Sequence, residues 1–275
     1  MTAAADFTDF GSFSEVDATP DAAPFVGALD DIAALPAVQR LRATANELLA
    51  VRLGHRLVDV GCGTGDQVRA LAAAVGPTGS VIGVDPSELL LAEARRRTGW
   101  RAGPIEFRLG DAAHLDVGDA SVDGARCERV FQHLADPAAA MAELVRVTRP
   151  GGRIVVVDTD WGMHALHGAD PEVTARVLAG WNAYLSTPLA GRRLPALFSE
   201  AGLHHPTVAA ETFTILDPTR ATRSPFPEMA TAATTAGSIT PTEADTWLTQ
   251  LREAGRRGHF LWAATMFAVA ATRPR

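Results

Sequence analysis

Three glycines at alternate positions, Gly61, Gly63 and Gly65, follow a short apolar stretch and precede alanines and leucines at helical spacing. Because glycine has no Cβ, such a turn lets the backbone lie directly against a ligand. The dinucleotide-binding fingerprint has glycine or alanine at the sixth position of this motif, where the chain has Asp66. A carboxylate at the start of a helix repels a pyrophosphate, so the sequence disfavours a nicotinamide dinucleotide.

Other carboxylates stand at the ends of predicted strands. Asp59 comes just before the glycines, Asp85 closes the second strand, and Asp111 closes the third. In an open α/β sheet the ligand lies beyond the carboxyl ends of the strands, so we expect these acids to line one crevice. They favour a ligand that is uncharged at its sugar, rich in hydrogen-bond donors and able to carry positive charge.

Strand-like and helix-like segments alternate in the first part of the chain. A helix is predicted from Pro36, and further helices begin near Thr64, Ser87 and Asp136, two of them opened by Ser or Asp as N-caps. This alternation predicts βαβ units and a parallel sheet covered by helices on both faces. The strands are expected at residues 56–60, 80–85, 105–111, 121–129 and 153–160.

The alternation breaks after residue 161. Helical patterns span residues 170–185 and 191–203, a strand-like pattern spans 207–216, and a long final strand is expected at 260–272. The insertion between those two strands, at residues 217–258, is longer than a connection requires, which is typical of a lid or binding element.

Composition excludes several kinds of function. The 275 residues carry a formal charge of -7, which argues against a nucleic-acid partner, and all 25 basic residues are arginine, which excludes a Walker loop and a Schiff-base lysine. With only two cysteines, Cys62 and Cys127, we expect free thiols, no metal site and a reducing cytoplasm. The acidic N-terminus and the lack of a long apolar run predict neither export nor a membrane span.

The segments "VDVGCGTGD", "VDPS", "GDAAHL", "CERVFQHLADP" and "RVTRPGGRIVVVD" resemble, in order and spacing, the motifs of class I S-adenosylmethionine-dependent methyltransferases. The resemblance is greatest to the small-molecule group that includes the ubiquinone and menaquinone C-methyltransferases, and it covers about residues 56–160. It implies an α/β fold with a Rossmann-like, seven-stranded, mostly parallel sheet. Helices cover both faces, the last strand is antiparallel, and helical cap elements are added.

The resemblance also implies which residues bind S-adenosylmethionine, a cofactor with donor groups, a sulfonium and no phosphate. The glycines would lie against its methionine part, Asp85 would accept from both ribose hydroxyls, and Asp111 with Ala112 would face the adenine. Cys127 would present its backbone to the methionine end. The expected cofactor-binding residues are Asp59, Gly61, Cys62, Gly63, Gly65, Asp85, Pro86, Ser87, Asp111, Ala112 and Cys127.

On the acceptor side, His133 is either a general base or a histidine that packs near the cofactor. Phe7, Phe10 and Phe13 recur every three residues, as on one face of a helix, and form either a lid or a docked tail. Arg40 and Arg42 are expected to be solvated helix charges, with contact of Arg42 to the methionine carboxylate as the alternative. The acceptor pocket is predicted to include Phe13, His133, Asp160, Trp161 and His164.

We therefore expect three parts: an N-terminal lid and helix (1–50), a cofactor-binding core (51–160), and the rest of the sheet with an acceptor-binding insertion (161–275, with the insertion at about 217–258). The expected activity is methyl transfer to a small, hydrophobic or aromatic acceptor. The abundance of alanine and arginine suggests a GC-rich genome and a place in secondary metabolism. A cyclase or a binding protein on the same fold, a nicotinamide-dependent oxidoreductase and a homo-oligomer stay open.

Overall fold

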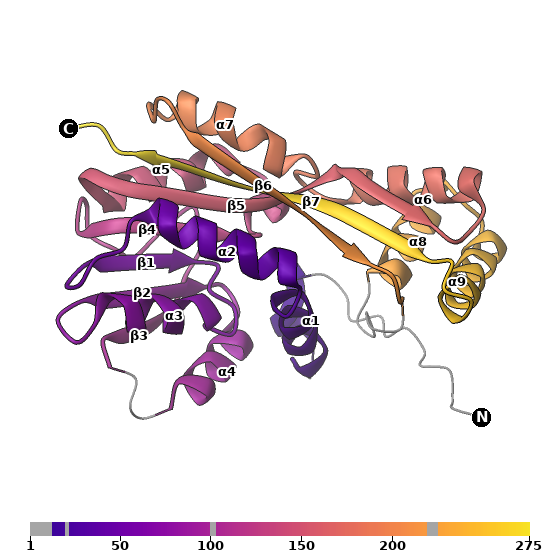
Figure 1. Ribbon diagram of the computed structural model, residues 1–275, viewed down its shortest axis with the longest axis horizontal. Coiled ribbons are helices and arrows are strands. Elements are labelled where there is room, and N and C mark those ends of the chain that lie inside the picture. Colours follow the sequence, from indigo (N-terminus) through magenta and orange to yellow (C-terminus); the bar gives the residue numbers. More distant parts are fainter. Residues whose placement is uncertain (1–12, 20–21, 100–102, 219–224) are drawn as a thin grey trace.

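The computed structural model describes residues 13–19, 22–99, 103–218 and 225–275. Within these ranges the sheet has seven strands in the order β3-β2-β1-β4-β5-β7-β6, and only β7 runs against its neighbours (Figure 1). The predicted Rossmann-like sheet with an antiparallel last strand is confirmed. The strands are β1 Arg56–Val60, β2 Ser80–Asp85, β3 Ile105–Leu109, β4 Val122–Glu128, β5 Thr148–His167, β6 Thr207–Ile215 and β7 Leu261–Thr272.

Helices connect and cover these strands. The N-caps predicted from sequence are confirmed: the Ser87 hydroxyl accepts the N–H of Leu90 at 3.1 Å, and the Asp136 carboxylate accepts that of Ala139 at 3.0 Å. Among the described residues the helices are η1 Phe13–Ala18, α1 Ala23–Ala33, α2 Pro36–Leu49, α3 Asp66–Val75, α4 Glu88–Thr98, η2 Phe131–His133, α5 Pro137–Val147, α6 Pro171–Tyr184, α7 Ala190–Glu200, α8 Phe226–Thr235 and α9 Pro241–Arg256. None of these is long and apolar enough to cross a membrane.

Two apolar cores sandwich the sheet. One contains Met141 of α5 and Phe198 of α7, and the other contains Leu41 of α2 and Leu71 of α3. Both faces of the central parallel strands are therefore buried, as the apolar runs in their sequences require. Polar side chains that could bind a ligand are therefore confined to the carboxyl ends of these strands.

The strand β5 is longer than predicted, because it continues past Asp160 to His167. Its second half pairs with β7, with Leu166 opposite Trp262, after an irregularity between Asp160 and Ala165. In Figure 1 this extension carries β5, β6 and β7 out to α6, α8 and α9, which form a helical cap at one end of the sheet.

Apolar side chains of the insertion pack inside this cap. Phe226, Met229 and Trp247 are fully buried among helices α6, α8 and α9, and Trp247 donates its indole N–H to Thr174 at 3.0 Å. The sequence predicted that the insertion binds the acceptor. These three side chains of the insertion form the interior of the cap, because the helices pack against one another.

The N-terminal part is attached to the core through η1. The Asp17 carboxylate accepts the backbone N–H of Glu88 at 2.8 Å, at the beginning of α4, and Val16 packs with Phe25 and Leu90. An acid at a helix N-terminus is stabilised by the unpaired N–H groups there. Phe7 and Phe10 lie outside the described residues, and so does the side chain of Phe13.

Candidate functional site

The glycine turn has the backbone conformation that its sequence predicted. Gly61, Gly63 and Gly65 have φ values of 71°, 52° and 76°, a region that other residues seldom occupy. At Gly61 an added Cβ would also lie 2.1 Å from a methyl carbon of Val130. Glycine is therefore required both by conformation and by the close approach of the chain that follows β4.

Asp85 holds this turn in place. Its carboxylate oxygens accept the N–H of Gly63 at 2.8 Å and the N–H of Ser87 at 3.0 Å, and the side chain is only 6% exposed. Burial raises the pKa of Asp85 to about 6, although the two N–H bonds oppose the shift. A desolvated carboxylate beside a glycine turn is well suited to accept hydroxyl groups from a bound sugar.

A cleft of about 330 Å³ lies beyond the ends of β1, β2 and β4. Asp66 lines it too, but its carboxylate pairs with Arg69. Asp111 is exposed at its edge, where it accepts the N–H of Ala113 at 2.8 Å. The predicted cofactor residues that line this cleft are Asp59, Gly61, Cys62, Gly63, Asp85, Pro86, Asp111 and Ala112.

Three predicted cofactor residues do not line the cleft. Gly65 lies under Phe107, Ser87 caps α4, and Cys127 is fully buried in β4. Cys127 stands opposite Val60 of the adjacent strand β1, and burial raises the pKa of its thiol well above the ordinary value. The first two residues shape the cleft, whereas Cys127 belongs to the core.

A buried network of charges lies at the floor of this cleft. The guanidinium of Arg126 bonds Asp59 at 3.1 Å and also pairs with Glu128, while Arg42 of α2 reaches Glu128 at 2.8 Å. Burial opposes ionisation of Glu128, but the two arginines outweigh it and lower its pKa to about 2. Asp59 has one arginine partner, and burial raises its pKa. Arg42 is thus an internal partner of Glu128 and not the solvated charge that we expected.

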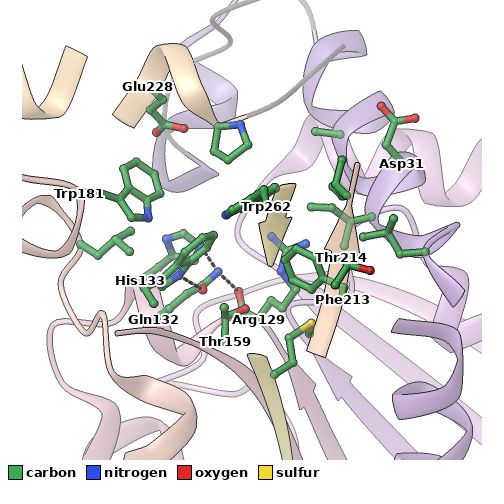
Figure 2. Close-up of a pocket in the computed structure, with 18 of the residues that line it drawn as sticks. Asp31, Arg129, Gln132, His133, Thr159, Trp181, Phe213, Thr214, Glu228 and Trp262 are labelled. Atoms are coloured by element: carbon green, nitrogen blue, oxygen red, sulfur yellow. Dashed lines mark hydrogen bonds between the residues drawn. The ribbon is translucent and has the colours of Figure 1, made fainter. Parts of the chain in front are cut away.

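A second, wider cavity of about 580 Å³ lies between the sheet and the cap. Its walls include residues of α1, β5, α6, β6, α8 and β7, and several aromatic side chains stand among them (Figure 2). Of these elements, α1 was not anticipated from the sequence. The aromatic side chains that line the cavity are Trp161, Trp181, Tyr184, Phe213 and Trp262.

The two cavities meet at three residues that line both: Arg129, Gln132 and His133. The amide oxygen of Gln132 accepts the indole N–H of Trp161 at 2.7 Å, and its nitrogen lies 3.0 Å from Nε2 of His133. Because an indole can only donate, this bond fixes the amide orientation, so Nε2 of His133 is the acceptor. Burial, with the Arg129 charge, lowers the pKa of His133 to about 4. At neutral pH its imidazole is uncharged, and the lone pair on Nε2 already accepts a hydrogen bond from Gln132.

Of the other residues predicted for the acceptor pocket, some line the wide cavity and some do not. Trp161 lines the wide cavity, but Asp160 does not: its carboxylate is fully buried and pairs with Arg192. His164 stands edge-on to Trp161 with ring centroids 5.9 Å apart and is also not part of the lining. Asp160 and His164, which we predicted for the acceptor pocket, therefore lie outside the lining of this cavity, because they belong to the continuing strand β5.

Sequence reasoning missed several lining residues. Arg129 stands within the segment "CERVFQHLADP", but nothing local distinguished it from other arginines. Phe213 and Trp262 come from adjacent strands, with ring centroids 5.3 Å apart. Neither strand shows a local pattern that distinguishes these two rings from aromatic residues of the core.

Comparisons with known proteins agree with this geometry. A family model described as "Methyltransferase domain" matches residues 58–156. The chain is 36% identical over 256 residues to an uncharacterized 37.1 kDa protein in transposon TN4556 of Streptomyces fradiae, covering 92% of this chain and 72% of that protein. It is 33% identical over 168 residues to methyltransferase GfsG of Streptomyces halstedii, covering 60% of this chain and 58% of GfsG.

Solved structures share the fold at low identity. Phosphoethanolamine N-methyltransferase 2 of Haemonchus contortus, solved with S-adenosylhomocysteine, superimposes with a TM-score of 0.52 at 17% identity, covering 84% of this chain and 53% of that one. The cyclase SpnF superimposes with a TM-score of 0.52 at 22% identity, covering 86% and 82%. With this fold, the matched domain and the extended similarity to its relatives, the chain belongs to the class I S-adenosylmethionine-dependent methyltransferases.

Proposed function

We propose that the protein transfers a methyl group from S-adenosylmethionine, bound in the narrow cleft, to a small hydrophobic or aromatic acceptor in the wide cavity. The observation that carries this proposal is the junction at Arg129, Gln132 and His133, which line both spaces. Two separate cavities that meet at one set of side chains are what a reaction between two bound molecules requires.

The residues of the cleft fit this cofactor. Gly61 and Gly63 of the glycine turn line the cleft, and Asp85 offers a desolvated carboxylate for ribose hydroxyls. Arg69 pairs with Asp66 at the start of α3, and we assign no ligand contact to that acid. When bound, S-adenosylmethionine supplies a methyl group activated by its sulfonium sulfur.

The protein's contribution is mainly to position the reactants and exclude water. Alignment of bound reactants lowers barriers by up to about 7 to 11 kcal/mol in the best intramolecular cases. The aromatic walls of the cavity exclude water and hold a flat acceptor, while Gln132 fixes His133 at the junction. We assign His133 an orienting role, because a base whose pKa is lowered to about 4 removes protons poorly at neutral pH.

The size of the wide cavity supports a small-molecule acceptor. At about 580 Å³ it lies within the usual range for ligand pockets, roughly 300 to 1,000 Å³. Trp181 and Phe213 both line it, and their aromatic surfaces favour aromatic or polyunsaturated compounds. The proposed setting in secondary metabolism rests on composition alone.

Mass spectrometry of the products tests the proposal. Purified protein is incubated with S-adenosylmethionine and panels of aromatic and polyketide-like compounds. A product heavier by one methylene, formed together with S-adenosylhomocysteine, supports methyl transfer. The resemblance to the cyclase SpnF favours a second candidate, in which the substrate is rearranged. A product of unchanged mass would assign the protein to that class.

A further inference from the structure

Arg129 carries a positively charged guanidinium at the point where the two cavities meet. No hydrogen bond or ion pair joins its guanidinium to any described side chain, although it lines both cavities. Glu128 and Asp158 are near enough for their charges to act on it, but neither bonds it directly: Glu128 binds Arg42 and Arg126, and Asp158 accepts the N–H groups of Gln132 at 3.2 Å and Thr159 at 2.7 Å. A guanidinium that lines a cavity with no direct partner among the described side chains points to an anionic ligand.

The backbone at Arg129 is held in an unusual conformation. Its φ is 59°, in the left-handed region, and its N–H donates to Val157 at 2.8 Å. A non-glycine residue in this region costs on the order of 1 kcal/mol and persists only where its surroundings require it. The turn directs the chain from β4 into η2 and brings Arg129 to the junction (Figure 2).

Two further donors in the same cavity have no acceptor among the described residues. The indole nitrogens of Trp181 and Trp262 are buried and make no hydrogen bond within the described part of the chain, although both residues line the wide cavity. By contrast, the indole of Trp161 bonds Gln132, and that of Trp247 bonds Thr174. Buried polar groups are nearly always paired in native structures, so a donor-rich cavity of this kind is suited to a ligand with oxygen acceptors.

Arg129 lies where the wide cavity meets the cofactor cleft. Figure 2 shows Arg129 in the lower part of the view and two acids of the cavity lining, Asp31 and Glu228, in the upper part. An anion entering this space is attracted by the guanidinium at the junction. Arg129 therefore orients such a ligand with its anionic end toward the cofactor cleft.

We infer that the acceptor is an aromatic anion, a carboxylate or a phenolate, whose oxygen pairs with Arg129. This inference rests on the proposed function and names the substrate class of the same site. An anionic oxygen supplies its own electron pair to the new O–C bond, the electrons of the broken S–C bond stay on sulfur, and no proton is released. A general base is then unnecessary, in agreement with the engaged and uncharged His133.

Calorimetry with a matched pair of probes tests the inference in the full chain saturated with S-adenosylhomocysteine. The probes are 2-naphthoate and 2-naphthamide, which have nearly the same shape but differ in charge. We expect the native protein to prefer naphthoate by about 10- to 100-fold, the range for one charge-assisted hydrogen-bonded pair. Arg129→Gln should abolish this preference, and Arg129→Lys should restore part of it.

Arg40→Gln is the control variant, because Arg40 is an exposed arginine that pairs with Glu211 at 2.9 Å on the surface. It should keep the native preference. Equal binding of the two probes to the native protein, or an unchanged preference in Arg129→Gln, would overturn the inference. It would also be overturned if Arg129→Gln lost affinity for S-adenosylhomocysteine and kept the probe preference, since Arg129 would then serve the cofactor carboxylate. Failure of native protein to bind S-adenosylhomocysteine would instead refute the proposed function.

Discussion

Replacing Asp85 by alanine should weaken the binding of S-adenosylhomocysteine far more than it weakens the fold. The carboxylate accepts N–H groups from Gly63 at 2.8 Å and Ser87 at 3.0 Å, and by our proposal it also accepts the ribose hydroxyls. The variant loses all of these bonds. It also removes a desolvated charge whose pKa is raised to about 6, and this relief offsets part of the cost to folding.

The magnitude follows from the hydrogen bonds to the ligand. Bonds to a charged acceptor contribute about 1.5 to 3 kcal/mol, so we expect the dissociation constant to rise by about 10- to 150-fold. Isothermal titration calorimetry of S-adenosylhomocysteine with native and variant protein measures this change, and urea unfolding of both proteins measures the accompanying change in stability.

Asp123→Ala is the matched control. Asp123 also accepts a backbone N–H, from Arg56 at 2.8 Å, and pairs with Arg149 at 2.7 Å, but it lies near the opposite end of β4 from the cleft. Its replacement should leave the affinity unchanged. If Asp85→Ala bound S-adenosylhomocysteine as tightly as the native protein, the assignment of Asp85 to the ribose would be refuted.

Three further predictions concern charge and thiols. Arg126→Met leaves Asp59 and Glu128 buried without their shared partner, so urea unfolding should show a loss of about 3 to 5 kcal/mol; a loss near zero would refute the network's structural role. Affinity for S-adenosylhomocysteine should fall as the pH drops from about 7.5 to about 5, because Asp85, with a pKa near 6, takes up a proton, and Asp85→Asn should remove this dependence. The same raised pKa lets the native state hold a proton that the unfolded chain releases between pH of about 4 and about 6, so this group's contribution to the unfolding free energy decreases as pH rises through that window. Thiol titration of denatured, unreduced protein should count two thiols, whereas native protein should react slowly, because burial raises both thiol pKa values; a count of zero would contradict free cysteines.

The local sequence pattern was sufficient to predict the central strands and the glycine turn. The predicted bounds of β1 and β2 match the structure, since short apolar runs between helices leave few alternatives. The extension of β5 to His167 depends on pairing with β7, about a hundred residues later, and no local signal reports such a partner. Asp160 was misplaced for the same reason, because its partner Arg192 lies on α7.

The charges of the site could not be assigned from the sequence either. Arg126 stands directly before the motif "CERVFQHLADP", Arg129 stands within it, and Arg42 lies far earlier in the chain. Yet Arg42 and Arg126 are the two that share the carboxylate of Glu128. Which guanidinium is left for a ligand depends on how α2 packs against β4. That is a tertiary property, so our inference of an anionic acceptor could be drawn only from the folded chain.

The central claim is that the narrow cleft binds S-adenosylmethionine beside an acceptor cavity. Calorimetric titration of the full chain with S-adenosylhomocysteine, run in parallel with NAD, tests it most directly. The account predicts binding of one S-adenosylhomocysteine per chain with micromolar affinity and no heat from NAD. Absence of binding by S-adenosylhomocysteine, or equal affinity for NAD, would contradict it.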